Sequence, residues 1–237
     1  MENDELDLIR SHYAGAMIAS SNFTAFRYID LVDLVGRNIE PRARVLDWGA
    51  GLGQVSLLLK NRGYDVTAFD IIERPAYYDG IDVKYVSGGD DLPFKDCIFD
   101  AVVACGALEH VDRDRHSLSE LRRVLKPGGL LFIFNLPNKY SLIEFFARHT
   151  SVGGHFHLYD KNEIRSKLLD ANFEVVRIEH AHMLPHNPSR MSLSVKSYDT
   201  NYVALRKIDH ALESIPLLRF FSNEWIAVAR RTDPTIH

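Results

Sequence analysis

Residues 45–53 read VLDWGAGLG, and this stretch decides the fold. Three glycines, Gly49, Gly51 and Gly53, follow a short apolar run at alternate positions. Glycine permits a sharp turn and brings backbone N–H groups close to a ligand, and a following helix directs its positive N-terminus to the same place. Asp47 adds a carboxylate at the floor of this turn, which repels a pyrophosphate and attracts a cationic ligand. The stretch predicts a strand–turn–helix unit with a ligand against the glycines.

Strand-like runs alternate with helical segments along the chain. Apolar runs such as ARVLDWG, DVTAFDI and GLLFIFNLP are separated by helical segments such as GQVSLLLKNRG and HSLSELRRVLKPGG. This alternation predicts βαβ units and a parallel sheet covered on both faces. A helix is expected from a cap at Asn22 to Gly36, and Asp160 with Glu163 has the spacing of a capping box that starts another. FEVVRIEHA and EWIAVARR supply two further strands.

Composition restricts the class of protein. The chain has 237 residues, of which 46% are hydrophobic and 25% charged, which suits one α/β domain, or one domain with a small appendage. Its net charge of −4 provides no overall field for nucleic acid or an acidic membrane. We find no signal peptide and no run long enough to cross a bilayer, so we expect a soluble, cytoplasmic protein. Cys97 and Cys105 are expected to be reduced core residues, not a disulfide.

Further motifs follow the glycines in a specific order. The second strand ends at Asp70, where a carboxylate can bind both hydroxyls of a ribose. The blocks LPF, LEHV and LKPGG come next. Together with D-x-G-x-G-x-G, they make residues 43–181 and the last strand resemble the class I S-adenosylmethionine-dependent methyltransferases, specifically the small-molecule, methyltransferase type 11-like group. The resemblance implies an α/β, Rossmann-like fold: a seven-stranded, mostly parallel sheet with an antiparallel last strand, helices on both faces and an N-terminal helical lid.

The resemblance also implies that the cofactor is S-adenosylmethionine. The glycine turn with Asp47 would hold its methionine end, Asp70 its ribose, and Ile71 its adenine. Cys105 and Gly106 would line the path between the cofactor and the acceptor.

The block that borders the adenine edge departs from the family pattern. Where the family usually reads G-D-A-x-x-L-P, this chain has Gly88 at the aspartate position. Asp90 and Asp91 are both candidates to replace that aspartate, and the register between them stays open. The implied cofactor-binding residues are Asp47, Gly49, Gly51, Gly53, Asp70, Ile71, Asp90, Asp91, Leu92, Cys105 and Gly106.

Transfer of a sulfonium methyl mainly requires positioning of the reactants and exclusion of water. A hydroxyl acceptor gains from a base, and histidine suits this role near neutral pH. The candidates are His110, His155 and His157. His110 also fits a role at a helix start, and the first histidine of a GHFHLY segment often faces the substrate in family members, so we favour His155. The sequence therefore predicts methyl transfer to a small-molecule acceptor, preferably to oxygen.

Two H-x-H pairs, His155/His157 and His180/His182, raise the question of a zinc site. Closely spaced histidines often serve hydrogen bonding instead, and we expect no metal. Ubiquinone-type O-methyltransferases carry E-x-x-E-H at the block that ends in His110, and here Gly106 replaces its first glutamate.

Other classes of function stay open as alternatives. A nicotinamide oxidoreductase shares the fold region, but Asp47, the missing third glycine of its fingerprint and the absence of a Tyr-x-x-x-Lys pair disfavour it. A non-catalytic cofactor-binding domain is the other alternative. Neither nucleic acid nor integral membrane association is expected, and a homodimer stays open. We expect a single domain over 1–237, with a helical lid at 1–36 and an insertion before the last strand at 182–221. For the amphipathic stretch 208–221, we expect packing in the core rather than contact with a lipid-linked substrate or a second subunit.

Overall fold

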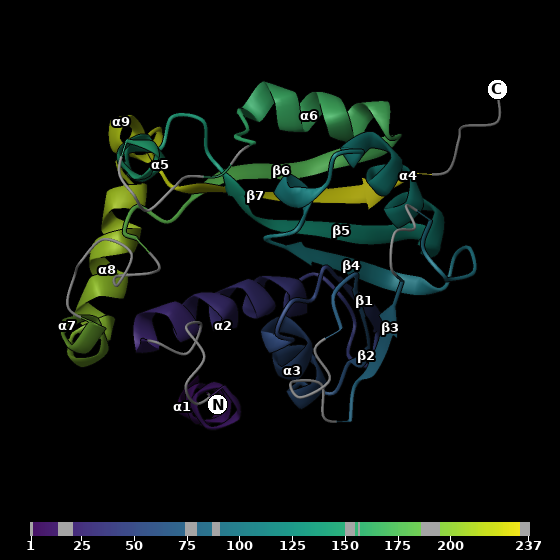
Figure 1. Cartoon of the computed structure of the whole chain (residues 1–237), viewed down its shortest axis with the longest axis horizontal. Coiled ribbons are helices and arrows are strands. Elements are labelled where there is room, and N and C mark those ends of the chain that lie inside the picture. The colour runs from purple at the N-terminus through teal and green to yellow at the C-terminus, as the bar shows by residue number, and fades with distance from the viewer. Residues whose placement is uncertain are drawn as a thin grey trace.

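The computed structural model describes residues 2–13, 21–73, 80–86, 91–149, 155, 157–185 and 195–232. Its strands are β1 (Arg44–Trp48), β2 (Asp65–Asp70), β3 (Asp82–Tyr85), β4 (Phe99–Cys105), β5 (Leu125–Pro137), β6 (Phe173–Ala181) and β7 (Glu224–Arg231). They form one seven-stranded sheet in the order β3-β2-β1-β4-β5-β7-β6 (Figure 1). Neighbouring strands from β3 to β5 are parallel, whereas β7 is antiparallel to both β5 and β6. The expected sheet is confirmed.

Helices cover both faces of this sheet (Figure 1). Strand residues alternate between two apolar clusters, because successive side chains of a strand point to opposite faces. Val45 and Phe132 pack with the N-terminal helices, whereas their neighbours Leu46 and Leu131 pack with the helices of the other face. The helices are α1 (Glu2–His12), α2 (Asn22–Gly36), α3 (Gln54–Asn61), η3 (Leu108–His110), α4 (Asp114–Val124), α5 (Leu142–Arg148), α6 (Lys161–Asp170), α7 (Val195–Thr200), α8 (Tyr202–Glu213) and α9 (Pro216–Arg219).

Helix caps differ from the expected ones at one place. The cap of α2 is Ser21, whose hydroxyl accepts a hydrogen bond from the Thr24 amide at 3.2 Å, so Asn22 is the first helical residue rather than the cap. The Asn22 amide instead donates to Asp199 at 2.6 Å. The Asp160 carboxylate accepts from the Glu163 amide at 3.0 Å, which confirms the predicted start of α6.

Two expectations about packing are wrong. In the stretch 208–221, large apolar residues are exposed, with Leu217 at 76% and Phe220 at 43%, so it does not pack in the core. This is because α9 and the end of α8 lie at the edge of the fold rather than on the sheet (Figure 1). Both cysteines are free, but Cys97 is exposed in the turn before β4 and only Cys105 is partly buried.

The fold places several chain segments at one edge of the sheet. The strand order reverses between β1 and β4, and in open α/β sheets ligands bind at the carboxyl ends of the strands beside such a point. The glycine turn after β1 and the loop after β4 therefore face one another. Among the described residues, no helix is both long and apolar enough to cross a membrane.

Candidate active site

The glycine turn connects β1 to α3 and packs against the loop after β4. Gly49 has φ +70°, and a Cβ built on it would lie 2.5 Å from the Cβ of Ala107. Its amide donates to the Phe69 carbonyl at 2.9 Å, which ties the turn to β2. Gly53 has φ +82° and precedes the first residue of α3. Only glycine fits at position 49, because it alone combines this conformation with so close an approach.

Asp47 lies beneath the turn and is 1% exposed. The Ser56 hydroxyl donates to its carboxylate at 2.6 Å, so Asp47 holds the first turn of α3. Burial raises the pKa of Asp47 to about 6, although the hydrogen bonds from Ser56 lower it. It is not among the residues that line the two cavities described below.

Asp70 ends β2 and joins it to the glycine turn. Its carboxylate accepts hydrogen bonds from the Gly51 amide at 2.7 Å and from the Ile72 amide at 2.8 Å. These two amides fix the orientation of Asp70.

A cavity of about 440 Å³ opens over the glycine turn. It lies between the turn, the loop after β4, α2 and the start of β7. Its polar groups come from segments far apart in the chain. The lining residues are Tyr28, Gly49, Ala50, Gly51, Leu52, Gln54, Cys105, Gly106, Glu109, His110, Asn135, His155 and Glu224.

A second cavity of about 280 Å³ continues along the same edge of the sheet. His110 lines both cavities, so the two meet at this side chain. The second cavity is more apolar. Its lining residues are Trp48, Phe69, Ile71, Leu92, His110, Val111, Asp112, Arg113, Ser117 and Glu120.

These cavities separate the residues predicted to bind the cofactor. Gly49, Gly51, Cys105 and Gly106 line the first cavity, and Ile71 and Leu92 line the second. Asp47, Gly53 and Asp70 line neither cavity. Gly53 belongs to the turn itself, Asp47 accepts a hydrogen bond from Ser56 of α3, and Asp70 accepts one from the Gly51 amide. Asp91 is exposed and pairs with His116 at 2.9 Å. Gly88 and Asp90 lie outside the described residues.

Among the three candidate bases, the structure sets His155 apart. Its Nδ1 lies 2.8 Å from Glu144 Oε1, and its amide donates to the other oxygen of Glu144 at 3.0 Å. The hydrogen bond to Glu144 raises the pKa of His155, although burial opposes this. His110 lines both cavities, and burial lowers its pKa. His157 pairs with Glu163 at 3.0 Å and lines neither cavity.

Glu109 is the second glutamate of the E-x-x-E-H comparison, and it faces the first cavity. It is 8% exposed, and its Oε2 has no hydrogen-bond partner among the described residues. Burial raises the pKa of Glu109 to about 7. A buried carboxyl that titrates near neutrality beside a cavity is typical of a functional group.

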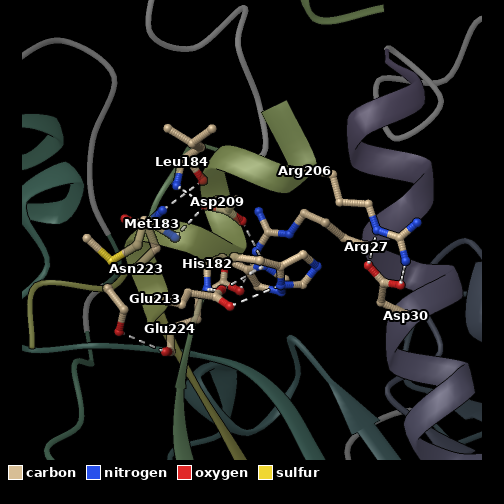
Figure 2. A network of polar contacts seen from close by, with 12 residues as sticks. Arg27, Asp30, His182, Met183, Leu184, Arg206, Asp209, Glu213, Asn223 and Glu224 are labelled. Carbon is tan, nitrogen blue, oxygen red and sulfur yellow. Dashed lines mark hydrogen bonds and ion pairs between the residues drawn. The ribbon is translucent and has the colours of Figure 1, made fainter. Parts of the chain in front are cut away.

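A polar network connects the first cavity to the insertion helices (Figure 2). Arg27 of α2 donates to Glu224 at 2.7 Å, and both side chains are buried. One turn along α2, Asp30 accepts from Arg206 of α8 at 3.1 Å. Further along α8, Asp209 accepts from the Leu184 amide at 2.6 Å. This network holds α8 against α2 and keeps Glu224 at the wall of the cavity.

The two H-x-H pairs do not meet in one cluster. His180 stacks on Trp225, with ring centroids 4.0 Å apart, and its Nδ1 lies 3.0 Å from the Ser222 hydroxyl. His182 faces Asp209 and Glu213 of α8. These two carboxylates already accept backbone amides of residues 182–184, so this group secures the chain after β6.

Sequence reasoning missed several groups of the site. Tyr28 and Glu224 line the cavity, and Arg27 and Glu144 hold the lining residues Glu224 and His155. None of the four belongs to a motif, because each comes to the site only through tertiary packing. Asn135 was considered only as part of a superficial NLPN match, yet it lines the cavity. Its one local signal is a φ of +59° within β5, where the pairing with β7 shifts register.

The residues present fit S-adenosylmethionine. The glycine turn packs so closely on the loop after β4 that a Cβ at position 49 would collide with Ala107, and the cavity opens over this turn. Glu109 presents an unpaired buried carboxyl oxygen to the cavity above it, which suits a cationic sulfonium. The two joined cavities also differ in polarity. The more polar one suits the amino-acid end of the cofactor, and the more apolar one suits its adenine end.

Comparison with known proteins agrees with this geometry. Residues 46–133 match the family model described as a methyltransferase domain. The matched residues run from β1 into β5 and include the glycine turn, so the match agrees with the resemblance to class I S-adenosylmethionine-dependent methyltransferases.

Particular relatives extend this finding. A demethylmenaquinone methyltransferase of Renibacterium salmoninarum is 36% identical over 113 residues, 44% of each chain. A sterol 24-C-methyltransferase of Gibberella zeae is 36% identical over 107 residues, 40% of this chain and 28% of the other. A SAM-dependent methyltransferase of Archaeoglobus fulgidus has the same fold, with TM-score 0.61, 20% identity, and 94% and 98% coverage. The chain spans less than half the length of the curated relatives it matches.

Proposed function

We propose that this protein transfers a methyl group from S-adenosylmethionine to a hydroxyl of a small-molecule acceptor. The observation that carries the proposal is His155, which lines the same cavity as Gly49 and Gly51 and is held by the Glu144 carboxylate. A carboxylate-held histidine is suited to remove a proton, and only an acceptor that must lose a proton benefits from one.

The chemistry needs few groups. S-adenosylmethionine supplies a methyl group bound to a positively charged sulfur. The acceptor oxygen would take that methyl carbon, and the sulfur would leave with the bonding electron pair as a neutral thioether. The hydroxyl proton goes to His155.

The protein orients the base and raises its pKa. Because ionised Glu144 accepts from Nδ1 of His155, the neutral imidazole carries its lone pair on Nε2. The same carboxylate stabilises the imidazolium that forms. The Glu144 hydrogen bond to the His155 amide fixes the segment itself, and Arg148 also donates to the His155 carbonyl.

Other residues of the cavity wall determine which hydrogen-bonding groups the acceptor needs. Glu109 and Glu224 bring carboxylates, and Asn135 brings an amide. A buried polar group that loses water without gaining a partner costs about 1–3 kcal/mol. An acceptor with several hydrogen-bond donors around its reactive hydroxyl is therefore favoured over a plain alcohol.

The experiment is a methyl-transfer assay with a panel of hydroxylated acceptors that includes quinols and sterols, since two relatives are named for such compounds. His155→Ala is compared with His157→Ala, which removes an exposed histidine two positions away. We expect His155→Ala to reduce kcat about 10²–10⁴-fold while S-adenosylhomocysteine binding is kept. Equal activity of the two variants would contradict the role of His155.

A further inference from the structure

Large apolar side chains gather on one surface of the molecule. Eight of the fourteen large apolar residues that are exposed in the described part fall within 140–146 and 215–220. The others are scattered singly or in pairs. We name this surface the α5–α9 face, and the residues on which the argument rests are Leu142, Phe145, Phe146, Leu217, Leu218 and Phe220.

The two helices of this face lie side by side (Figure 1). The Tyr140 ring, just before α5, stacks on the Phe220 ring at the end of α9, with centroids 4.6 Å apart. The Asn138 side chain donates to the Phe220 carbonyl at 3.0 Å. On α5, Leu142, Phe145 and Phe146 have the i, i+3, i+4 spacing that puts them on one side of a helix. The face is thus one fixed surface rather than two separate ones.

Positive charges outnumber negative ones around this face. Residues 139–149 and 214–221 contain three lysines or arginines, Lys139, Arg148 and Arg219, and one acidic residue, Glu144. Glu144 is turned toward His155 and is only 12% exposed at its side chain. Asp160 partly offsets Lys139, at 3.6 Å. A chain with net charge −4 therefore presents an apolar face with a basic rim.

We propose that the α5–α9 face docks on an anionic lipid bilayer. Exposed aromatic and aliphatic side chains with arginine and lysine around them are the composition of elements that lie in a membrane interface. A second copy of this chain is a poorer match, because a two-fold contact would bring the same cations of both copies together. Leu217, Phe145 and Phe146 are 76%, 57% and 56% exposed, so they can enter the lipid without rearrangement of the core.

The position of this face has a consequence for the reaction. The short helix α5 carries Phe145 and Phe146 on its outer side and Glu144, which holds His155, on its inner side. A bilayer at this face would lie one helix away from the proposed base, so a lipid-dissolved acceptor would reach the site from the membrane. This consequence rests on the proposed function, whereas the docking itself does not.

Flotation with lipid vesicles tests the proposal. Vesicles of phosphatidylcholine and phosphatidylglycerol in equal parts are compared with vesicles of phosphatidylcholine alone. We expect binding to the anionic vesicles that weakens with salt. Phe145→Ser/Leu217→Ser should reduce this binding about tenfold or more, and Arg219→Gln about fivefold.

Matched controls use exposed residues elsewhere. Leu169→Ser/Val176→Ser removes two apolar side chains of α6 and β6 that are 49% and 46% exposed, and it should bind as the unaltered chain does. Absence of binding by the folded chain, equal binding to neutral vesicles, or equal loss in the control would overturn the proposal. The proposal would also be overturned if the unaltered chain bound no vesicles but formed a dimer that Phe145→Ser/Leu217→Ser converts to monomers.

S-adenosylhomocysteine binding, measured on the same samples, separates this proposal from the proposed function. A chain that floats with vesicles but does not bind S-adenosylhomocysteine contradicts the proposed function alone. A chain that binds S-adenosylhomocysteine and ignores anionic vesicles contradicts the docking proposal alone.

Discussion

Replacement of Gly49 by alanine gives a sharp test of the glycine turn. The new Cβ would lie 2.5 Å from the Ala107 Cβ, far closer than side-chain atoms pack, at a φ of +70°. The left-handed backbone costs about 1–2 kcal/mol for a residue with a Cβ, and overpacking in a tight site costs about 1–3 kcal/mol. Gly49→Ala should therefore lower the free energy of unfolding by about 2–5 kcal/mol.

Gly63→Ala isolates the backbone part of this cost. Gly63 has φ +84°, and nothing lies within 4 Å of a Cβ there. Both substitutions also restrict the unfolded chain equally, so that contribution cancels between them. Urea unfolding of the two variants should thus differ by the clash alone, about 1–3 kcal/mol. A difference below about 0.5 kcal/mol would show that the turn adapts and would refute the close-approach argument.

Gly51→Ala separates stability from ligand binding. Gly51 lines the first cavity, and a Cβ on it would meet only the Gly49 carbonyl oxygen at 3.9 Å. The free energy of unfolding of Gly51→Ala should equal that of Gly63→Ala. Its affinity for S-adenosylhomocysteine should fall, because the new Cβ enters the cavity. Unchanged affinity in Gly51→Ala would mean that the ligand lies elsewhere.

Two further changes test the charged groups. Glu144→Gln removes the carboxylate that raises the pKa of His155, so this pKa should fall. Because the base acts only when it is neutral, the acid limb of the pH–rate profile should move to lower pH. An acid limb that does not move would exclude His155 as the titrating group. Arg27→Met removes the guanidinium that pairs with the buried Glu224 carboxylate and should cost about 3–5 kcal/mol of unfolding free energy. Arg44→Met, which breaks an exposed pair, should cost at most about 1 kcal/mol in the same urea titration, and similar losses would refute the distinction.

The sequence was sufficient to predict the parts of the site that depend on local chain geometry. The glycine turn, the strand alternation and the capping box of Asp160 are each encoded within a few residues, because backbone conformation and periodicity are local properties. Ser21 took the place of Asn22 as a cap because both residue types can cap, and the tertiary contact of the Asn22 amide with Asp199 decides between them.

The walls of the cavity could not be predicted in the same way. Glu144 reaches His155 across 11 positions of chain, and Glu224 arrives from the last strand to meet Arg27, which is 197 positions away. No spacing rule connects such residues. The amphipathic stretch 208–221 showed that a periodic apolar pattern identifies a face, but not whether the protein itself covers that face.

The most direct test of the account is a calorimetric titration of the purified chain with S-adenosylhomocysteine, in parallel with an Asp70→Ala variant. The account predicts micromolar binding by the unaltered chain and at least a tenfold weaker affinity in the variant, which loses both the proposed ribose contact and the hydrogen bond to the Gly51 amide. Absence of binding by the folded, unaltered chain would contradict the central claim that the joined cavities over the glycine turn hold S-adenosylmethionine.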